Sequence, residues 1–498
     1  MSTTTPDRNA LLLYGRWERP RSTGLFGMTW GVTVLAGLLL IGIIVCFVFT
    51  QSLVMTGVLI AVSVVGMAPL VYSRDGRTGW EMTVLRVQFN WARLRKQTVY
   101  RGGVFGQVPG TARLPGIAAG SHMYGYELRD GQRFGLIHYP AKNHFTVSLA
   151  VQPQGQERVD QWQINEWVAA QGDFLARLGS ARGAVGAEVV VESVPDAGAR
   201  IGAEVRRITD PNAPAFTREV MAETVLTRGS ARVRSDVRLT LTFAPLREAS
   251  SREVADQAAE IGRRLSTLIV AAAQAGIAAS ALSPGELTLY PTRAYNPELT
   301  ADLERISGTA DGEELRWTGA GPITATEEWD CYRHNGFTSV SWEMGTPPAG
   351  QVPSDTLLPL LAPRADLPRK RVALIYRVHS AADAVKLVDN DFREALAAEQ
   401  SKKGVVSASA SLRVQNTNAA RSEQARGAGL TRFGMLVTAT VPAGSDLPTM
   451  RSEIEAMGDS ARIGLRRCWG YQAAAFAGSL GMGTILPEYA SISGKLGG

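Results

Sequence analysis

Charged side chains are absent from residues 24–73, and this absence says more about the chain than any other feature. A bilayer core tolerates almost no ionised side chains, and one membrane helix needs about 20 apolar residues. The uncharged run is too long for one such helix. It fits two, over residues 28–49 and 53–72, with a turn at residues 50–52. The sequence therefore predicts a transmembrane helical hairpin.

A cleaved signal peptide is a poor alternative, because its apolar core has roughly 7–15 residues. Basic residues flank the run on both sides while the turn carries none, so the positive-inside rule places both ends in the cytoplasm. The prediction is a multi-pass protein of the inner or plasma membrane with both termini cytoplasmic. The predicted membrane-interface residues are Arg16, Arg19, Arg21, Arg74, Arg77, Trp80, Arg86, Trp91, Arg93, Arg95 and Lys96.

Residues 74–101 are predicted to form a basic juxtamembrane amphipathic helix. Trp80, Val84, Val87 and Trp91 recur at helical spacing and share one face. Tryptophan beside basic residues is typical of a helix lying on membrane lipid. The alternative is that this face packs on the rest of the protein. The net charge of +6 is interpreted as attraction to anionic membrane lipid, which is favoured over nucleic acid as the partner.

Cysteine and histidine are scarce, with 3 and 5 residues. The sequence contains no C-x-x-C pair, no H-E-x-x-H motif, no nucleotide-binding G-x-x-x-x-G-K-[ST] loop and no G-x-S-x-G elbow. Asp389-Asn390-Asp391 resembles a D-x-D motif, but on a helix its two carboxylates would project about 200° apart. We predict no catalytic, cofactor-binding or metal-binding residue, and a protein that is not an enzyme.

Beyond the predicted hairpin the sequence has an α+β pattern. Residues 233–243 alternate apolar and polar side chains, which predicts a strand with one wet face, and residues 251–277 predict a long amphipathic helix. A strand is also predicted at 286–290. A helix is predicted at 215–226, before the strand at 233–243. A similar order of helix, strand and helix returns at 414–426, 434–441 and 446–459.

This recurrence predicts two related α/β modules, with helices on a mainly antiparallel sheet. The predicted units are a cytoplasmic arm at 1–23, the hairpin at 24–73, the juxtamembrane helix at 74–101, and the two modules at 102–292 and 293–498.

Two stretches resemble known families. The arm, the uncharged run and the Gly-Arg-Thr-Gly-Trp-Glu stretch at 76–81 resemble the PrgI-like membrane subunits of mobile elements. Actinobacterial members of that family are longer and are encoded near a separate conjugation ATPase. The modules and the closing stretch, from Gln472 through Phe476 and Leu480 to Pro487, resemble the N-terminal, non-ATPase domain of the type IV secretion ATPase. No functional residue carries over.

The resemblance implies a non-enzymatic inner-membrane scaffold of a type IV secretion or conjugative transfer apparatus. Its implied partners are a separate secretion ATPase, other inner-membrane secretion subunits and further copies of itself. One alternative is a peripheral membrane component of a type VII secretion system, which also has two N-terminal helices and a cytoplasmic α/β domain. The other is a membrane-anchored glycosyltransferase, for which the placement of Asp389 and Asp391 is the test.

Overall fold

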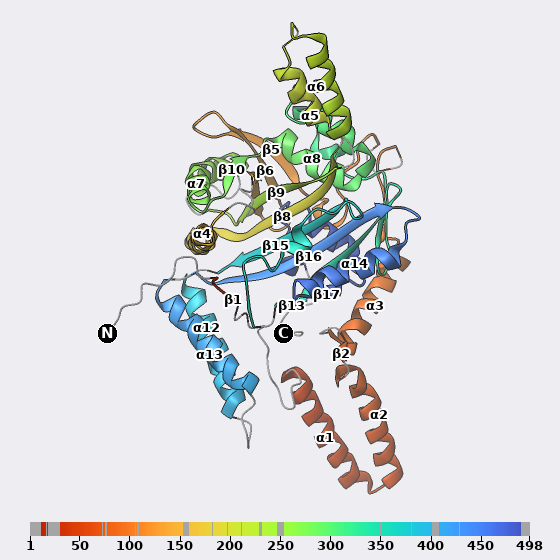
Figure 1. The fold of residues 1–498 in the computed structure, drawn as a ribbon. Coiled ribbons are helices and arrows are strands. Elements are labelled where there is room, and N and C mark those ends of the chain that lie inside the picture. Colours follow the sequence, from red (N-terminus) through yellow and green to blue (C-terminus); the bar gives the residue numbers. More distant parts are fainter. Residues whose placement is uncertain are drawn as a thin grey trace, which may run out of the picture.

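The structure of the protein is a computed structural model, and its fold is shown in Figure 1. The described residues are 11–15, 17, 30–71, 73–74, 77–104, 106, 109–152, 159–181, 183–196, 198–210, 212–228, 232–246, 253–348, 350–379, 381–400, 408–427 and 429–489. The helices are α1 (Trp30–Thr50), α2 (Leu53–Val71), α3 (Gly79–Leu94), α4 (Gln161–Ser180), α5 (Ala199–Ile208), α6 (Ala215–Arg228), α7 (Val254–Gln274), α8 (Pro284–Tyr295), α9 (Thr300–Ile306), α10 (Ala310–Glu313), α11 (Leu358–Leu361), α12 (Ala381–Gln400), α13 (Ala408–Ala425), α14 (Leu447–Ser460), α15 (Gln472–Gly478) and α16 (Leu486–Tyr489).

One continuous sheet of 13 strands organises the fold, and its neighbouring strands are antiparallel. Its strands are β4 (Val99–Arg101), β5 (His122–Glu127), β6 (Arg133–Tyr139), β7 (His144–Gln152), β8 (Ala184–Asp196), β9 (Arg232–Phe243), β10 (Ala278–Ala281), β11 (Thr324–Glu327), β12 (Tyr332–His334), β13 (Phe337–Thr346), β15 (Lys370–Val378), β16 (Thr431–Pro442) and β17 (Gly464–Arg467). The spatial order is β4-β11-β12-β13-β16-β15-β8-β9-β7-β6-β5, with β10 on β7 and β17 on β13. The predicted α+β class and antiparallel sheet are confirmed.

The same order of elements occurs twice in this sheet. The first repeat runs β7-α4-β8-α5-α6-β9-α7-β10, and the second runs β13-α11-β15-α12-α13-β16-α14-β17. The strand order is β10-β7-β9-β8 in one and β17-β13-β16-β15 in the other. Each is a ferredoxin-like β-α-β-β-α-β unit with a helical hairpin inserted between its two middle strands. The repeats meet edge to edge, where β8 pairs with β15.

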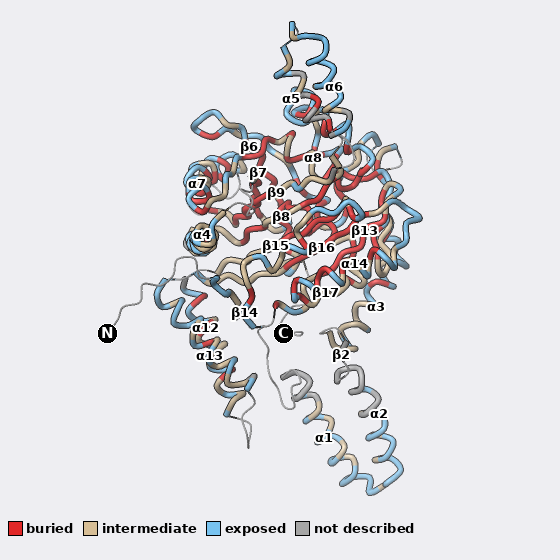
Figure 2. Tube along the Cα trace, viewed as in Figure 1, coloured by how far each residue is buried: buried red, intermediate tan, exposed pale blue. Residues whose placement is uncertain are grey.

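The two inserted helical hairpins project from the body of the protein (Figure 1). The α5–α6 hairpin extends from one end of the sheet, and the α12–α13 hairpin extends from the other side. Their outer surfaces are largely exposed, in contrast to the buried strands (Figure 2). Phe216 on α6 is 75% exposed and Leu412 on α13 is 53% exposed.

Helices cover one face of the sheet and build an apolar core over each repeat. In the first repeat, α4 and α7 contribute Phe174 and Ile261, which pack with Leu241 of β9. In the second repeat, α14 contributes Ile454, which packs with Val437 of β16. Burial of these apolar side chains is the main stabilising contribution to each unit.

The opposite face of the sheet is polar and also buried. In β9, Thr240 and Thr242 alternate with the core residues, yet they are 0% and 2% exposed. The predicted wet face is therefore wrong, because α8 and the C-terminal segment cover it. Thr240 donates to the carbonyl oxygen of Gly481 at 2.8 Å, and Tyr139 donates to that of Met482 at 3.1 Å. The C-terminal segment thus packs on the first repeat.

The strand predicted at 286–290 is part of helix α8. Ser283 caps this helix: its hydroxyl accepts from the backbone N–H of Glu286, whose carboxylate accepts from the backbone N–H of Ser283. Pro284 occupies the first helical turn, where it loses no hydrogen bond. This capping box outweighs the strand preference of the aromatic and β-branched residues that follow.

The uncharged run forms α1 and α2, with Gln51 and Ser52 between them. Residues 24–29 and 72 lie outside the described part. Within the described residues, no helix has the length and apolar character to cross a membrane. The predicted transmembrane hairpin, and the multi-pass membrane localisation derived from it, are therefore contradicted.

Candidate docking groove

The two predicted interface tryptophans of helix α3 are exposed. Trp80 is 53% exposed and Trp91 is 57% exposed. The helix is held instead by its other side, where buried Phe89 meets the ring of Trp329 at 5.4 Å and the Arg86 guanidinium lies 4.4 Å from that ring. The alternative that the tryptophan face packs on the rest of the protein is therefore not observed.

The remaining predicted interface residues do not converge on one site. Arg77 lies before α3 and pairs with Glu343 of β13 at 2.8 Å. Arg95 stacks over Trp91 at 4.6 Å. Arg93 is in the last turn of α3, Lys96 follows the helix, and the backbone of Arg74 forms the short strand β2 (Ser73–Arg74), paired with β3 (Arg77–Thr78). Arg16, Arg19 and Arg21 lie outside the described residues.

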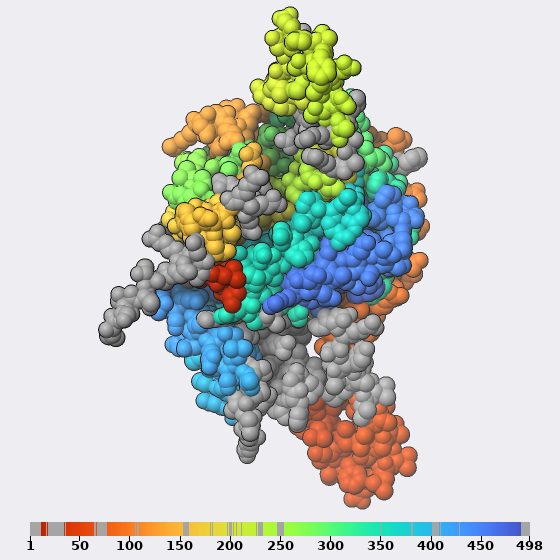
Figure 3. Space-filling view, in the orientation of Figure 1, coloured from red at the N-terminus to blue at the C-terminus, as the bar shows by residue number. Residues whose placement is uncertain are grey.

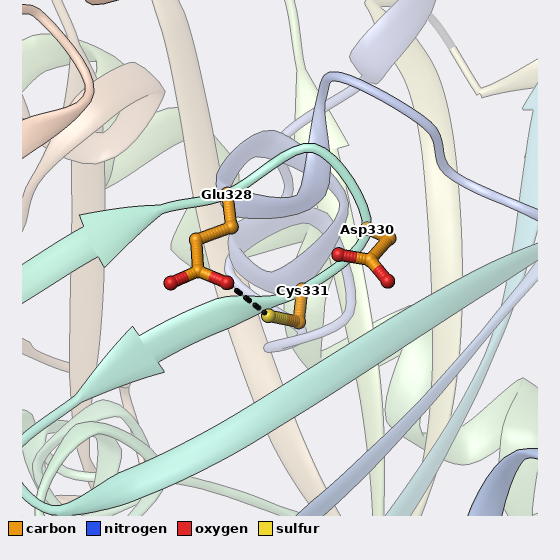
Figure 4. A group of neighbouring side chains, drawn as sticks. All are labelled: Glu328, Asp330 and Cys331. Atoms are coloured by element: carbon orange, nitrogen blue, oxygen red, sulfur yellow. Dashed lines mark hydrogen bonds between the residues drawn. The ribbon is translucent and has the colours of Figure 1, made fainter. Parts of the chain in front are cut away.

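One group of side chains has the composition of a metal site. In the described part of the chain this group is Glu328, Asp330 and Cys331, whose ligand atoms lie within 4.8 Å of one another (Figure 4). Their other contacts argue against a metal. The Cys331 thiol donates to Glu328 at 3.3 Å, and burial together with that bond raises the pKa of the thiol to about 12.

The two carboxylates of this group are already paired with arginines. Arg333 lies 2.8 Å from Glu328, and Arg451 lies 2.7 Å from Asp330. A metal prefers a thiolate to a thiol, and it would have to displace both guanidinium groups. We therefore interpret the group as a structural cluster of ion pairs.

The two aspartates of the D-x-D stretch lie on α12 and have different surroundings. Asp389 pairs with Arg421 of α13 at 2.8 Å, whereas Asp391 lines a groove beside the sheet. One carboxylate thus ties the two helices of the hairpin together. The pair does not form the convergent carboxylate set that a nucleotide-sugar metal site needs.

The groove that contains Asp391 has a volume of about 670 Å³. Its floor is formed by apolar residues of β15 and β16. One wall is α4, which presents Val168 and Leu175, and the facing wall is the α12–α13 hairpin. The rim is the segment between β13 and α11. The floor residues are Leu374, Tyr376, Phe433 and Met435.

The groove exists because the two repeats differ at one element. Between β7 and β8 the first repeat has α4, a helix of 20 residues. The corresponding connection between β13 and β15 has the two-residue strand β14 (Gln351–Val352) and α11, a helix of 4 residues. The sheet over β15 and β16 therefore lacks the cover that α4 gives to the first repeat. This difference leaves apolar sheet surface accessible from one side.

The N-terminal part of the chain borders the same groove. The strand β1 (Tyr14–Gly15) pairs with β14 (Gln351–Val352), and Trp17 meets Phe433 edge to face at 5.5 Å. In Figure 3, β1 (red) lies between α4, the sheet and the α12–α13 hairpin. Burial raises the pKa of the Tyr14 hydroxyl, which has no hydrogen-bond partner among the described residues.

Sequence reasoning missed this groove. Residues 344–369 are predicted from their Pro, Gly and Asp content to form a loop, and a loop carries no signal about what it leaves uncovered. A comparison of the helices of the two modules could have shown that the second module lacks a counterpart of the long helix α4.

Among protein families, residues 21–81 match DUF8461, a domain of unknown function. The matched part includes α1, α2 and the start of α3, and it ends before the sheet. No curated protein matches the chain.

Proposed function

We propose that the protein is a non-enzymatic assembly subunit of a type IV secretion or conjugative transfer apparatus that recruits a separate ATPase. The observation that carries the proposal is the groove beside β15 and β16. A large apolar groove bordered by projecting helices suits the capture of another protein's segment. The link to a secretion apparatus rests on the resemblance of residues 76–81 and 472–487 to subunits of such machines.

The internal repeat indicates what kind of segment would fit. In the first repeat, α4 covers the corresponding sheet face and buries Phe174 and Leu178 there. A partner helix with apolar residues at positions i, i+3 or i+4, and i+7 would bury the floor of the groove in the same way. We therefore expect an amphipathic helix of the ATPase to occupy the position that the short α11 leaves open.

Co-purification with a co-expressed secretion ATPase tests the proposal. Ala420 of α13 is exposed and lines the groove. The Ala420→Trp variant fills the groove from its rim without a change in the core, and it should reduce recovery of the ATPase at least tenfold. Leu374→Glu, which places a charge on the floor, should have the same effect.

Gln415→Trp is the matched control, because Gln415 is exposed on the same helix and does not line the groove. It should bind the ATPase as the wild type does. Thermal unfolding of all variants separates lost binding from lost folding. If Ala420→Trp and Gln415→Trp recover the ATPase equally well, the groove is not the docking site. If the wild type recovers no ATPase, the proposed function fails.

A further inference from the structure

A second, much smaller cavity lies on the polar face of the sheet, at the junction of the two repeats. It has room for about one water-sized sphere. Its walls come from β8, β15, β16 and α8, so both repeats contribute. The polar residues that line it and enter the argument are Glu192, Arg293, Arg369, Arg371, Thr438 and Thr440.

Positive charge exceeds negative charge around this cavity. Glu192 is the acidic residue in its lining, and one of its oxygens is already shared by Arg238 at 2.9 Å and Arg293 at 2.7 Å. Burial alone would raise the pKa of Glu192, but these guanidinium groups hold it well below its usual range. The carboxylate is therefore ionised, and its charge is divided among several arginines.

Among the described residues, Arg371 and Arg369 lack the short carboxylate contacts that Arg293 makes with Glu192 and Asp236. Arg371 comes no closer than 3.6 Å to Glu192, and its side chain is 6% exposed. Its Nη2 atom has no hydrogen-bond partner among the described residues. Among the described residues, Arg369 donates to two neutral oxygens, those of Thr300 and Pro297. The pKa of each side chain is lowered to about 10, chiefly by burial and, for Arg369, also by the neighbouring Arg293 charge.

An unpaired buried charge costs several kcal/mol, so a counter-ion would stabilise this arrangement. We infer that the cavity between Arg293, Arg369 and Arg371 binds a small inorganic anion. Thr438 and Thr440 lie in the same lining, but their hydroxyls are already hydrogen-bonded to Ser479 and Ser339, so the arginines are the groups that would hold the anion. The size of the cavity favours a halide such as chloride. A phosphate could bind only with a single oxygen inside the cavity and the rest of the ion outside it.

Thermal unfolding at constant ionic strength tests this site in the full-length protein. Gluconate, which is too large for the cavity, is replaced stepwise by chloride, and phosphate is used in a second series. Binding to the folded state should raise the Tm of the wild type by a few degrees in a saturable way. A larger shift with chloride than with phosphate assigns the halide, and the reverse assigns an oxyanion.

Arg369→Gln should abolish the saturable shift. Arg364→Gln, an exposed arginine paired with Asp366 in the same segment, should keep it. Arg369→Lys preserves the charge and should retain a weaker response, which covers the case in which Arg369→Gln does not fold. An equal Tm in gluconate, chloride and phosphate would overturn the inference. So would a response of Arg369→Gln equal to that of the wild type.

Discussion

At the scale of single residues, the polar face of the sheet is organised around two glutamates of β8 with opposite protonation. Glu192 is ionised because arginines surround it. Glu188, four residues earlier on the same face, is fully buried, and burial raises its pKa to about 8. Backbone N–H groups of Gly481 and Gly483 and the Arg238 charge counteract the shift but do not cancel it. Glu188 is therefore protonated at neutral pH.

Glu188 should make the stability of the protein fall as the pH rises. The folded state keeps a proton that the unfolded chain releases above its ordinary pKa of 4.5. The stabilising contribution is therefore complete below that value and is lost as the pH rises through about 8. Glu188→Gln, which cannot ionise, should gain stability relative to the wild type over this window, by up to a few kcal/mol.

Denaturant unfolding at pH 5, 7 and 9 measures this effect. Glu223→Gln, on the exposed surface of α6, is the matched control and should parallel the wild type at every pH. A constant difference between Glu188→Gln and the wild type from pH 5 to pH 9 would contradict the assignment of a protonated Glu188.

At the scale of elements, periodicity in the sequence predicted the strands and helices that depend on residues close together in the chain. The alternation at 233–243 became β9, and the amphipathic stretch at 251–277 became α7. The strand predicted at 286–290 was wrong because Thr288 and Tyr290 favour strands, while the cap at Ser283 and Glu286 decides the helix. The groove could not be predicted either, because it depends on the absence of a helix from one repeat.

The cap of α8 is therefore expected to contribute measurably to stability. Ser283→Ala removes the hydroxyl that accepts from the backbone N–H of Glu286. The loss should be about 1 kcal/mol in the free energy of unfolding, as is typical for an N-cap serine. Denaturant unfolding is the measurement. Ser422→Ala, in the exposed helix α13, should be neutral or slightly stabilising, and an equal loss in both variants would show that the cap is unimportant.

At the scale of the whole molecule, the two repeats are joined by more than the β8–β15 edge. The C-terminal segment follows the second repeat in sequence but crosses the polar face of the first. Arg238 of β9 donates to the carbonyl oxygen of Leu480 at 3.2 Å, and Lys142 contacts that of Glu488. Sequence patterns could not show this crossing, since they report the face of a strand but not what covers it.

Gly483 marks the closest approach of the C-terminal segment to the first repeat. Its φ of 76° favours glycine, and a Cβ there would collide with the hydroxyls of Thr146 and Thr242. Gly483→Ala should therefore lower the free energy of unfolding by more than about 2 kcal/mol, because strain and a steric clash add together.

Gly444 is the matched control: its φ is 89°, and a Cβ there would meet nothing within 4 Å. Gly444→Ala should cost only the backbone strain, about 1 kcal/mol. Equal losses of unfolding free energy in the two variants would contradict the predicted clash at Gly483. Two separate unfolding transitions in the wild type would show that the C-terminal segment does not couple the two repeats.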